Sequence, residues 1–164
     1  EENCDGAGGD LERANDLISD TQVASRYELW KETPKNIGSE GYKIAVVVDE
    51  IQKVIDQAQE GIILRHQEES EALGELEKQM GIRGSGRKEL EAKHKREIRR
   101  FRTDELQFGL SIIANLYKEE LVEAPNSSNI RAIEKIRSTM VTLGRNPNEK
   151  LLLQSLFISL SEFK

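Results

Sequence analysis

The sequence has few of the residues on which disulfides, metal sites and aromatic stacking depend. Its 164 residues include one cysteine, two histidines and 5% aromatic residues. Cys4 has no second cysteine with which to form an internal disulfide, and with His66 and His94 it cannot supply the four ligands of a structural zinc site. We therefore expect a reducing, cytoplasmic setting, and neither a metal nor a cofactor.

Long apolar runs are missing as well. The richest apolar segment covers residues 106–121 and is interrupted by polar and charged side chains, namely Gln107, Asn115, Lys118, Glu119 and Glu120. A membrane span needs about 20 consecutive, predominantly apolar residues, so no membrane partner is expected. The chain begins with EEN and a glycine-rich run, without a methionine or a signal-peptide pattern. This start predicts a fragment of a longer polypeptide.

Catalytic patterns are absent too. The segment GIRGSGRK at residues 81–88 lacks the spacing of a phosphate-binding loop and follows no predicted strand. His66 has no second histidine four residues away, so the glutamates that follow it indicate a solvated acidic face rather than a metal site. We expect His94, inside a lysine- and arginine-rich run, to lie at the surface. The sequence predicts no catalytic residue and no enzyme activity for this chain by itself.

What the sequence does contain is helical periodicity. Apolar residues recur every three or four positions, and no segment alternates apolar and polar residues between turns. These patterns predict an all-α bundle of five or six helices. The expected helices cover residues 11–19, 21–33 before Pro34, 40–80, 87–122, a segment capped by Asn129, and a last segment capped by Asn148.

The two longest expected helices form a protruding hairpin at about residues 60–100. Three glycines within residues 81–86 would let the chain reverse between them. The far half of the first helix is acidic and poorly apolar. The second helix starts basic and then becomes apolar on more than one face, which predicts burial on several sides.

Charge is distributed unevenly along the chain. The net charge is -6, yet residues 83–102 contain nine basic and three acidic residues, which gives +6 on this segment and -12 on the rest. Two interpretations are open. The segment pairs with acidic residues 68–77 across the hairpin, which we favour, or it binds nucleic-acid phosphates in a salt-dependent manner. The candidate contacts with DNA or an acidic partner are Arg83, Arg87, Lys88, Lys93, Lys95 and Arg96.

Several motifs, in order, resemble the delta-prime subunits of bacterial DNA polymerase III clamp loaders. They are GGDLERANDL at residues 8–17 followed by Arg26 and Trp30, KREIRRFRTD at residues 95–104, LYKEEL at residues 116–121, and NEKLLLQSLFISL at residues 148–160. Gln154 stands where the family usually has Glu, and the register of Gly9 places Glu12 where ATP-binding relatives carry a sensing arginine. The resemblance spans nearly the whole chain.

The resemblance implies that residues 1–20 are the end of an AAA+ lid domain with its linker and that residues 21–164 are a C-terminal collar, a helical oligomerisation domain. Such a collar belongs to the polymerase holoenzyme of the bacterial cytoplasm. The implied partners are the gamma/tau and delta subunits through the collar, and the sliding clamp and primed DNA through the complete complex. The candidate subunit-interface residues are Arg99, Arg100, Asp104, Tyr117 and Phe157.

Overall fold

The computed structural model describes residues 21–38, 40–81, 84 and 86–163. Every secondary-structure element in this part of the chain is an α-helix, which confirms the predicted all-α class. The helices are α3 (Thr21–Asn36), α4 (Gly41–Ala58), α5 (Glu60–Met80), α6 (Arg87–Glu123), α7 (Ser127–Leu143) and α8 (Glu149–Glu162). Cys4, the helix expected at residues 11–19 and the segment 1–20 assigned to a lid lie outside the described residues.

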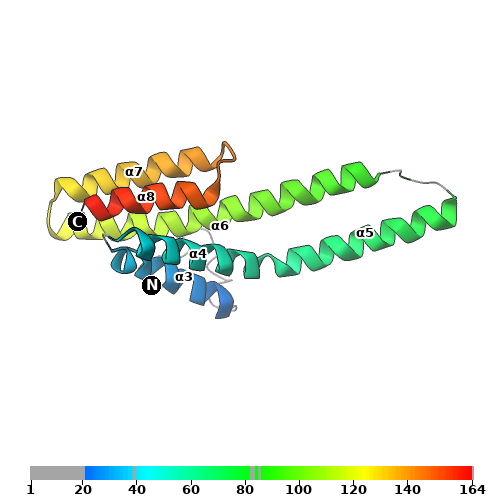
Figure 1. The fold of residues 1–164 in the computed structure, drawn as a ribbon, viewed down its shortest axis with the longest axis horizontal. Helices are drawn as coiled ribbons and strands as arrows, with labels where there is room; N and C mark the ends of the chain where they lie inside the picture. Colours follow the sequence, from blue (N-terminus) through cyan, green and yellow to red (C-terminus); the bar gives the residue numbers. More distant parts are fainter. Residues whose placement is uncertain (1–20, 39, 82–83, 85, 164) are drawn as a thin grey trace.

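The helices form a bundle from which an arm of two helices projects (Figure 1). The long helix α6 runs through both parts. Its C-terminal half packs against α3 and α7 in the bundle, and its N-terminal half accompanies α5 along the arm. Helix α8 packs on both α4 and α7. The arm is the protruding hairpin that the sequence predicts.

The core lies between one face of each short helix and several faces of α6. The buried residues of α4 recur every three or four positions along one face, at Ile44, Val47, Val48, Ile51 and Ile55. Buried residues of α6 follow one another closely, at Leu106, Phe108, Gly109, Leu110, Ile112, Ile113 and Tyr117. This half of α6 is therefore enclosed on several sides, as expected. Trp30 and Phe157 are the largest side chains that are completely buried.

Helices α3 and α6 are in close contact at Gly109. A Cβ atom added at Gly109 would lie 1.9 Å from Cε2 of Trp30, whose side chain is 1% exposed. Glycine inside a helix costs about 0.5–1 kcal/mol relative to alanine, so the contact with the indole ring explains why this position lacks a side chain. One turn earlier on each helix, Arg26 Nε donates to Glu105 Oε2 at 3.1 Å. An aromatic contact and an ion pair thus fix α3 on α6.

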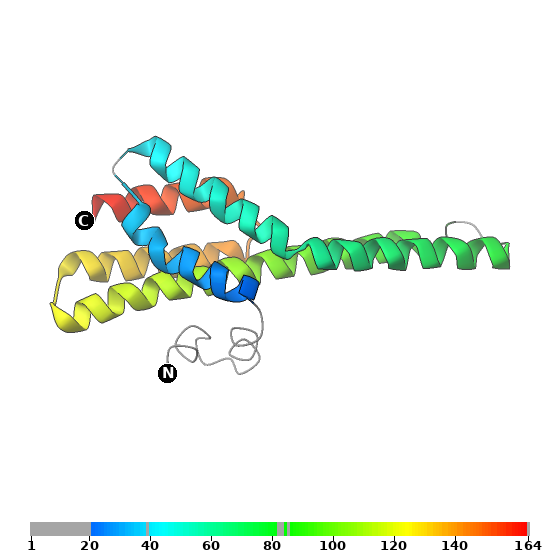
Figure 2. The same cartoon turned by 90° about the horizontal axis from the view of Figure 1, so that it is seen from below.

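The segment expected to form one helix over residues 40–80 is two helices, which corrects the prediction. The break falls at Gln59, and Figure 2 shows the change of direction between α4 and α5. The carbonyl of Gln59 accepts hydrogen bonds from the amides of Ile62 and Ile63 at 3.0 and 3.1 Å, so backbone bonding continues across the break. The bend lets α4 follow α8 while α5 leaves the bundle beside α6, which a straight helix could not do.

The end of α3 also differs from the prediction. The helix continues past Pro34 to Asn36. A proline in the last turn removes its own amide hydrogen bond but leaves those of its neighbours, and the amide of Ile37 still reaches the carbonyl of Thr33 at 3.0 Å.

The expected caps of the last two helices have different outcomes. Helix α7 is capped by Asn126 rather than Asn129, because the Asn126 side chain accepts from the amide of Ser128 and starts the helix earlier. Helix α8 is capped by Asn148, whose side chain accepts from the amide of Leu151, as predicted.

Candidate functional site

Ion pairs hold the two helices of the arm together. Glu77 accepts from Arg87 at 2.7 Å near the tip, and Glu69 accepts from Lys93 at 3.0 Å further toward the bundle. These pairs join the acidic and basic segments of the hairpin. The favoured interpretation, charge pairing across the hairpin, is therefore confirmed for these residues.

Two histidines stack in the seam between the arm helices, contrary to expectation. The rings of His66 and His94 have centroids 3.9 Å apart and planes 10° from parallel. Their side chains are 10% and 12% exposed. The surface position predicted for His94 is wrong, because each ring covers the other and both lie against the opposite helix.

A repeated motif accounts for this stack. The pattern of a basic residue, histidine, two further residues and glutamate occurs at residues 65–69 and again at residues 93–97. Residues three apart share a helix face, so each repeat presents a histidine and a glutamate to the other helix. His66 Nε2 donates to Glu97 Oε2 at 2.9 Å, and His94 Nε2 donates to Glu69 Oε2 at 3.0 Å. The repeat is the sequence signal that could have located the pair.

The histidines favour the charged form of both glutamates. Hydrogen bonds from His94 and then Lys93 lower the pKa of Glu69 from 4.5 to about 2. The hydrogen bond from His66, aided by the charge of Arg65, lowers the pKa of Glu97. The folded arm favours the Glu69 carboxylate, so this carboxylate stabilises the fold above pH 4.5. The stabilisation is lost as the pH falls from 4.5 to about 2, because the carboxylate becomes protonated.

Replacement of His94 by alanine is expected to raise the pKa of Glu69 toward 4.5, because it removes the strongest hydrogen bond to that carboxylate. Carbon-13 NMR titration of the side-chain carboxyls measures this change. Glu97 is the internal control, since its pKa is lowered by His66 and should stay low. A Glu69 pKa that does not move in His94→Ala would contradict the pairing.

Arg102 fastens the base of the arm to the bundle. Its Nη2 lies 2.8 Å from Glu149 Oε2 of α8 and 2.6 Å from Gln52 Oε1 of α4, and its Nη1 pairs with Asp56 of α4. Burial opposes its charge, yet hydrogen bonds to Glu149 and Asp56 raise the pKa of Arg102 above the ordinary arginine value. This residue of the basic segment therefore joins α4, α6 and α8 where the arm leaves the bundle.

The candidate contacts for DNA or an acidic partner divide into two groups. Arg87 and Lys93 are engaged within the arm, and Arg83 lies outside the described residues. The others are exposed and form no ion pair within the part of the chain that the structure describes: Lys88, Lys95 and Arg96.

The candidate interface residues are spread over surface and core. Arg99 and Arg100 are exposed, and Arg100 Nε lies 3.6 Å from Asp104 Oδ2. Tyr117 is 7% exposed and Phe157 is 0% exposed. A completely buried side chain does not touch a second subunit, so Phe157 supports α8 from the inside.

Exposed apolar side chains gather on the outer surfaces of α4 and α8. These helices lie side by side and run in opposite directions (Figure 1). Their outward apolar residues, here called the α4–α8 face, are Tyr42 (66% exposed), Val46 (60%), Leu151 (62%) and Ile158 (47%). An ion pair of 2.6 Å between Lys150 and Asp49 joins the two helices.

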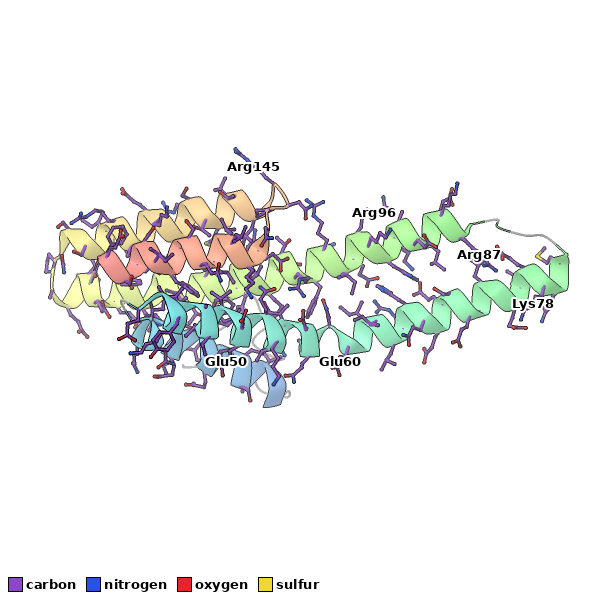
Figure 3. All side chains as sticks on the ribbon, viewed as in Figure 1. Glu50, Glu60, Lys78, Arg87, Arg96 and Arg145 are labelled. Atoms are coloured by element: carbon purple, nitrogen blue, oxygen red, sulfur yellow. The ribbon has the colours of Figure 1, made fainter. Side chains whose placement is uncertain are left out.

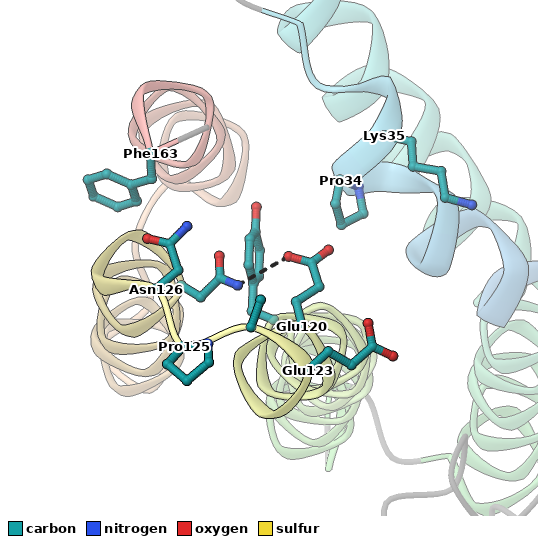
Figure 4. Close-up of a pocket in the computed structure, with 10 residues that line it drawn as sticks. Pro34, Lys35, Glu120, Glu123, Pro125, Asn126 and Phe163 are labelled. Atoms are coloured by element: carbon teal, nitrogen blue, oxygen red, sulfur yellow. Dashed lines mark hydrogen bonds between the residues drawn. The ribbon is translucent and has the colours of Figure 1, made fainter.

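A cavity of about 680 Å³ opens at the end of the bundle opposite the arm (Figure 4). Pro34, Glu120 and Phe163 contribute to its lining, and Glu120 accepts from Asn129 at 3.3 Å. Tyr117 also lines it, and its buried hydroxyl has no hydrogen-bond partner among the described residues. Burial and the nearby Glu120 raise the pKa of Tyr117, so the phenol stays protonated at neutral pH. The cavity lining thus combines the carboxylate of Glu120 with apolar side chains and the neutral ring of Tyr117.

The described residues offer neither a metal site nor a membrane-spanning helix. In these ranges, no group of three or more His, Cys, Asp and Glu side chains is arranged to hold a metal ion. None of the helices there combines the length and apolar character needed to cross a membrane.

No protein-family model, curated protein or solved structure matches the chain.

Proposed function

We propose that this chain is a non-catalytic assembly domain, the collar of a delta-prime subunit in a bacterial DNA polymerase III clamp loader. In this role it holds subunits together in the cytoplasm while the complete complex uses ATP to load the sliding clamp onto primed DNA. The ordered motifs shared with that family support the proposal. The observation that carries it is the α4–α8 face, because an apolar surface on a packed bundle is typical of a protein interface.

The register of α4 and α8 brings the apolar residues of this face together. Tyr42 lies seven residues before Asp49, and Ile158 lies eight residues after Lys150. Because the helices are antiparallel and Asp49 pairs with Lys150, Tyr42 and Ile158 lie at the same level, with Val46 next to them. An aromatic and aliphatic centre bordered by charged residues is the usual composition of a subunit interface.

The double variant Val46→Asp/Ile158→Asp is expected to lose association with the collar fragments of the gamma/tau and delta subunits. Two carboxylates placed in the centre of an apolar interface should weaken binding at least about a hundredfold. Sedimentation velocity of the chain mixed with those fragments, at low and high salt, measures the loss. The wild-type complex should survive high salt, since apolar contacts are not screened.

Val141→Asp is the matched control, because Val141 is 64% exposed but lies on α7 outside the α4–α8 face. This variant should assemble as the wild type does. If the wild-type chain forms no complex at tens of micromolar, the proposed function fails. If the complex forms and the double variant still joins it, the function stands but the interface lies elsewhere.

A further inference from the structure

The outer side of the arm carries cations that the hairpin does not use. Lys88, Lys95 and Arg99 follow one another at seven and four residues and share one stripe of α6, with Arg96 beside them. All are exposed and form no ion pair within the described ranges. The stripe lies opposite His94 and Glu97, which face α5, and continues into the bundle as the buried Leu106 and Ile113.

Arg145 extends this charge onto the bundle. It lies in the turn between α7 and α8, is exposed, and pairs with no carboxylate in the described part of the chain. Figure 3 shows Arg96 and Arg145 pointing to the same side of the molecule, away from α5. We call the five side chains the outer cationic face: Lys88, Lys95, Arg96, Arg99 and Arg145.

The composition of this face indicates which class of partner it can bind. Between Met80 and Val122, no large apolar side chain that the structure describes is exposed. The centre of a protein interface is depleted in charged residues and rich in aromatic and apolar ones. A face of five cations, with the exposed Glu91 between Lys88 and Lys95, therefore suits a polyanion better than a folded protein. Phe101, the aromatic residue of the basic segment, is packed against the core, so no exposed ring is offered for base stacking.

We propose that the outer cationic face binds the phosphate backbone of double-stranded nucleic acid without sequence preference. Lys88 and Arg99 are eleven residues apart, which is about 16 Å along a helix, and a duplex presents one negative charge per about 1.7 Å of its axis. The exposed acidic residues of α5, such as Glu68 and Glu71, repel phosphates from the other side of the arm. The duplex therefore lies along α6, against the turn that holds Arg145.

Binding of the 164-residue chain to a fluorescein-labelled 25-base-pair DNA duplex tests this inference by anisotropy between 50 and 200 mM NaCl. With four to five phosphates neutralised, the plot of log K against log salt should have a slope of about -4. The double variant Arg96→Gln/Arg99→Gln should bind at least about tenfold more weakly at 50 mM NaCl. Its slope should be shallower by about 2, one unit for each lost phosphate contact.

Lys31→Gln/Lys35→Gln is the matched control, because it changes the net charge equally but lies on α3, at the end of the bundle opposite the arm. It should bind DNA as the wild type does. No binding at 50 mM NaCl, an equal loss in both double variants, or stronger binding to a poly-glutamate peptide than to the duplex would each overturn the inference. None of these measurements depends on the clamp-loader subunits, so failure here leaves the proposed assembly role intact.

Discussion

Replacement of Gly109 by alanine is expected to destabilise the bundle by about 3 kcal/mol, at the upper end of the usual cost of overpacking a core. The new Cβ would lie 1.9, 2.1 and 2.4 Å from three atoms of the Trp30 ring. Ordinary carbon contacts need about 3.5 Å, so α3 and α6 must separate by well over an ångström or the indole must leave its site. The expected fall in Tm is about 10 °C, measured by circular dichroism and by the fluorescence of Trp30, the one tryptophan of the chain.

Gly61→Ala is the control for this experiment. A Cβ at Gly61, near the start of α5, meets no atom within 4 Å, and alanine favours a helix over glycine by about 1 kcal/mol. The Tm of this variant should stay the same or rise. If Gly109→Ala were equally harmless, the contact between α3 and α6 would not be as close as the structure places it.

The contact at Gly109 also illustrates what the sequence alone could not predict. A glycine in an apolar helix has several explanations, and the indole that requires this one lies about 80 residues away in the chain. The bend at Gln59 is of the same kind. The apolar pattern continues through the break, and the bend follows from the different partners of α4 and α5. The contact at Gly109 and the bend at Gln59 therefore depend on tertiary packing, which the local apolar periodicity does not show.

Other features follow from local chemistry and were predictable. The glycines after Met80 end one arm helix, and Gly81 has the left-handed conformation, with φ of 67°, that favours glycine at this position. The opposite charges of the arm segments predicted their pairing. The histidine stack was not predicted, because each histidine was considered only with its neighbours in the sequence. The two repeats explain the stack once they are placed on neighbouring antiparallel helices. The sequence thus predicted a charged hairpin. It could not show which cations of the hairpin pair with glutamates and which form no ion pair among the described residues.

Glu105→Ala is expected to destabilise the bundle by about 3–5 kcal/mol, the usual cost of removing one partner from a buried ion pair. Arg26 and Glu105 are 9% and 5% exposed, and their side chains meet at 3.1 Å between α3 and α6. Without the carboxylate, the guanidinium stays in a site from which water is largely excluded. The free energy of unfolding, measured with urea, gives the loss, and Arg26→Ala should produce a similar one.

The double variant Arg26→Met/Glu105→Leu separates the cost of an unpaired charge from the value of the pair. Apolar side chains of similar length leave no charge to desolvate, so most of the stability lost in Glu105→Ala should return. Lys35→Ala is the exposed counterpart, since Lys35 and Glu32 are paired with side chains 71% and 47% exposed, and it should cost less than about 1 kcal/mol. If the double variant were as unstable as Glu105→Ala, the unpaired buried charge would not be the main cause of the loss. The hydrogen bonds of the pair would then be the interaction that stabilises the contact of α3 with α6.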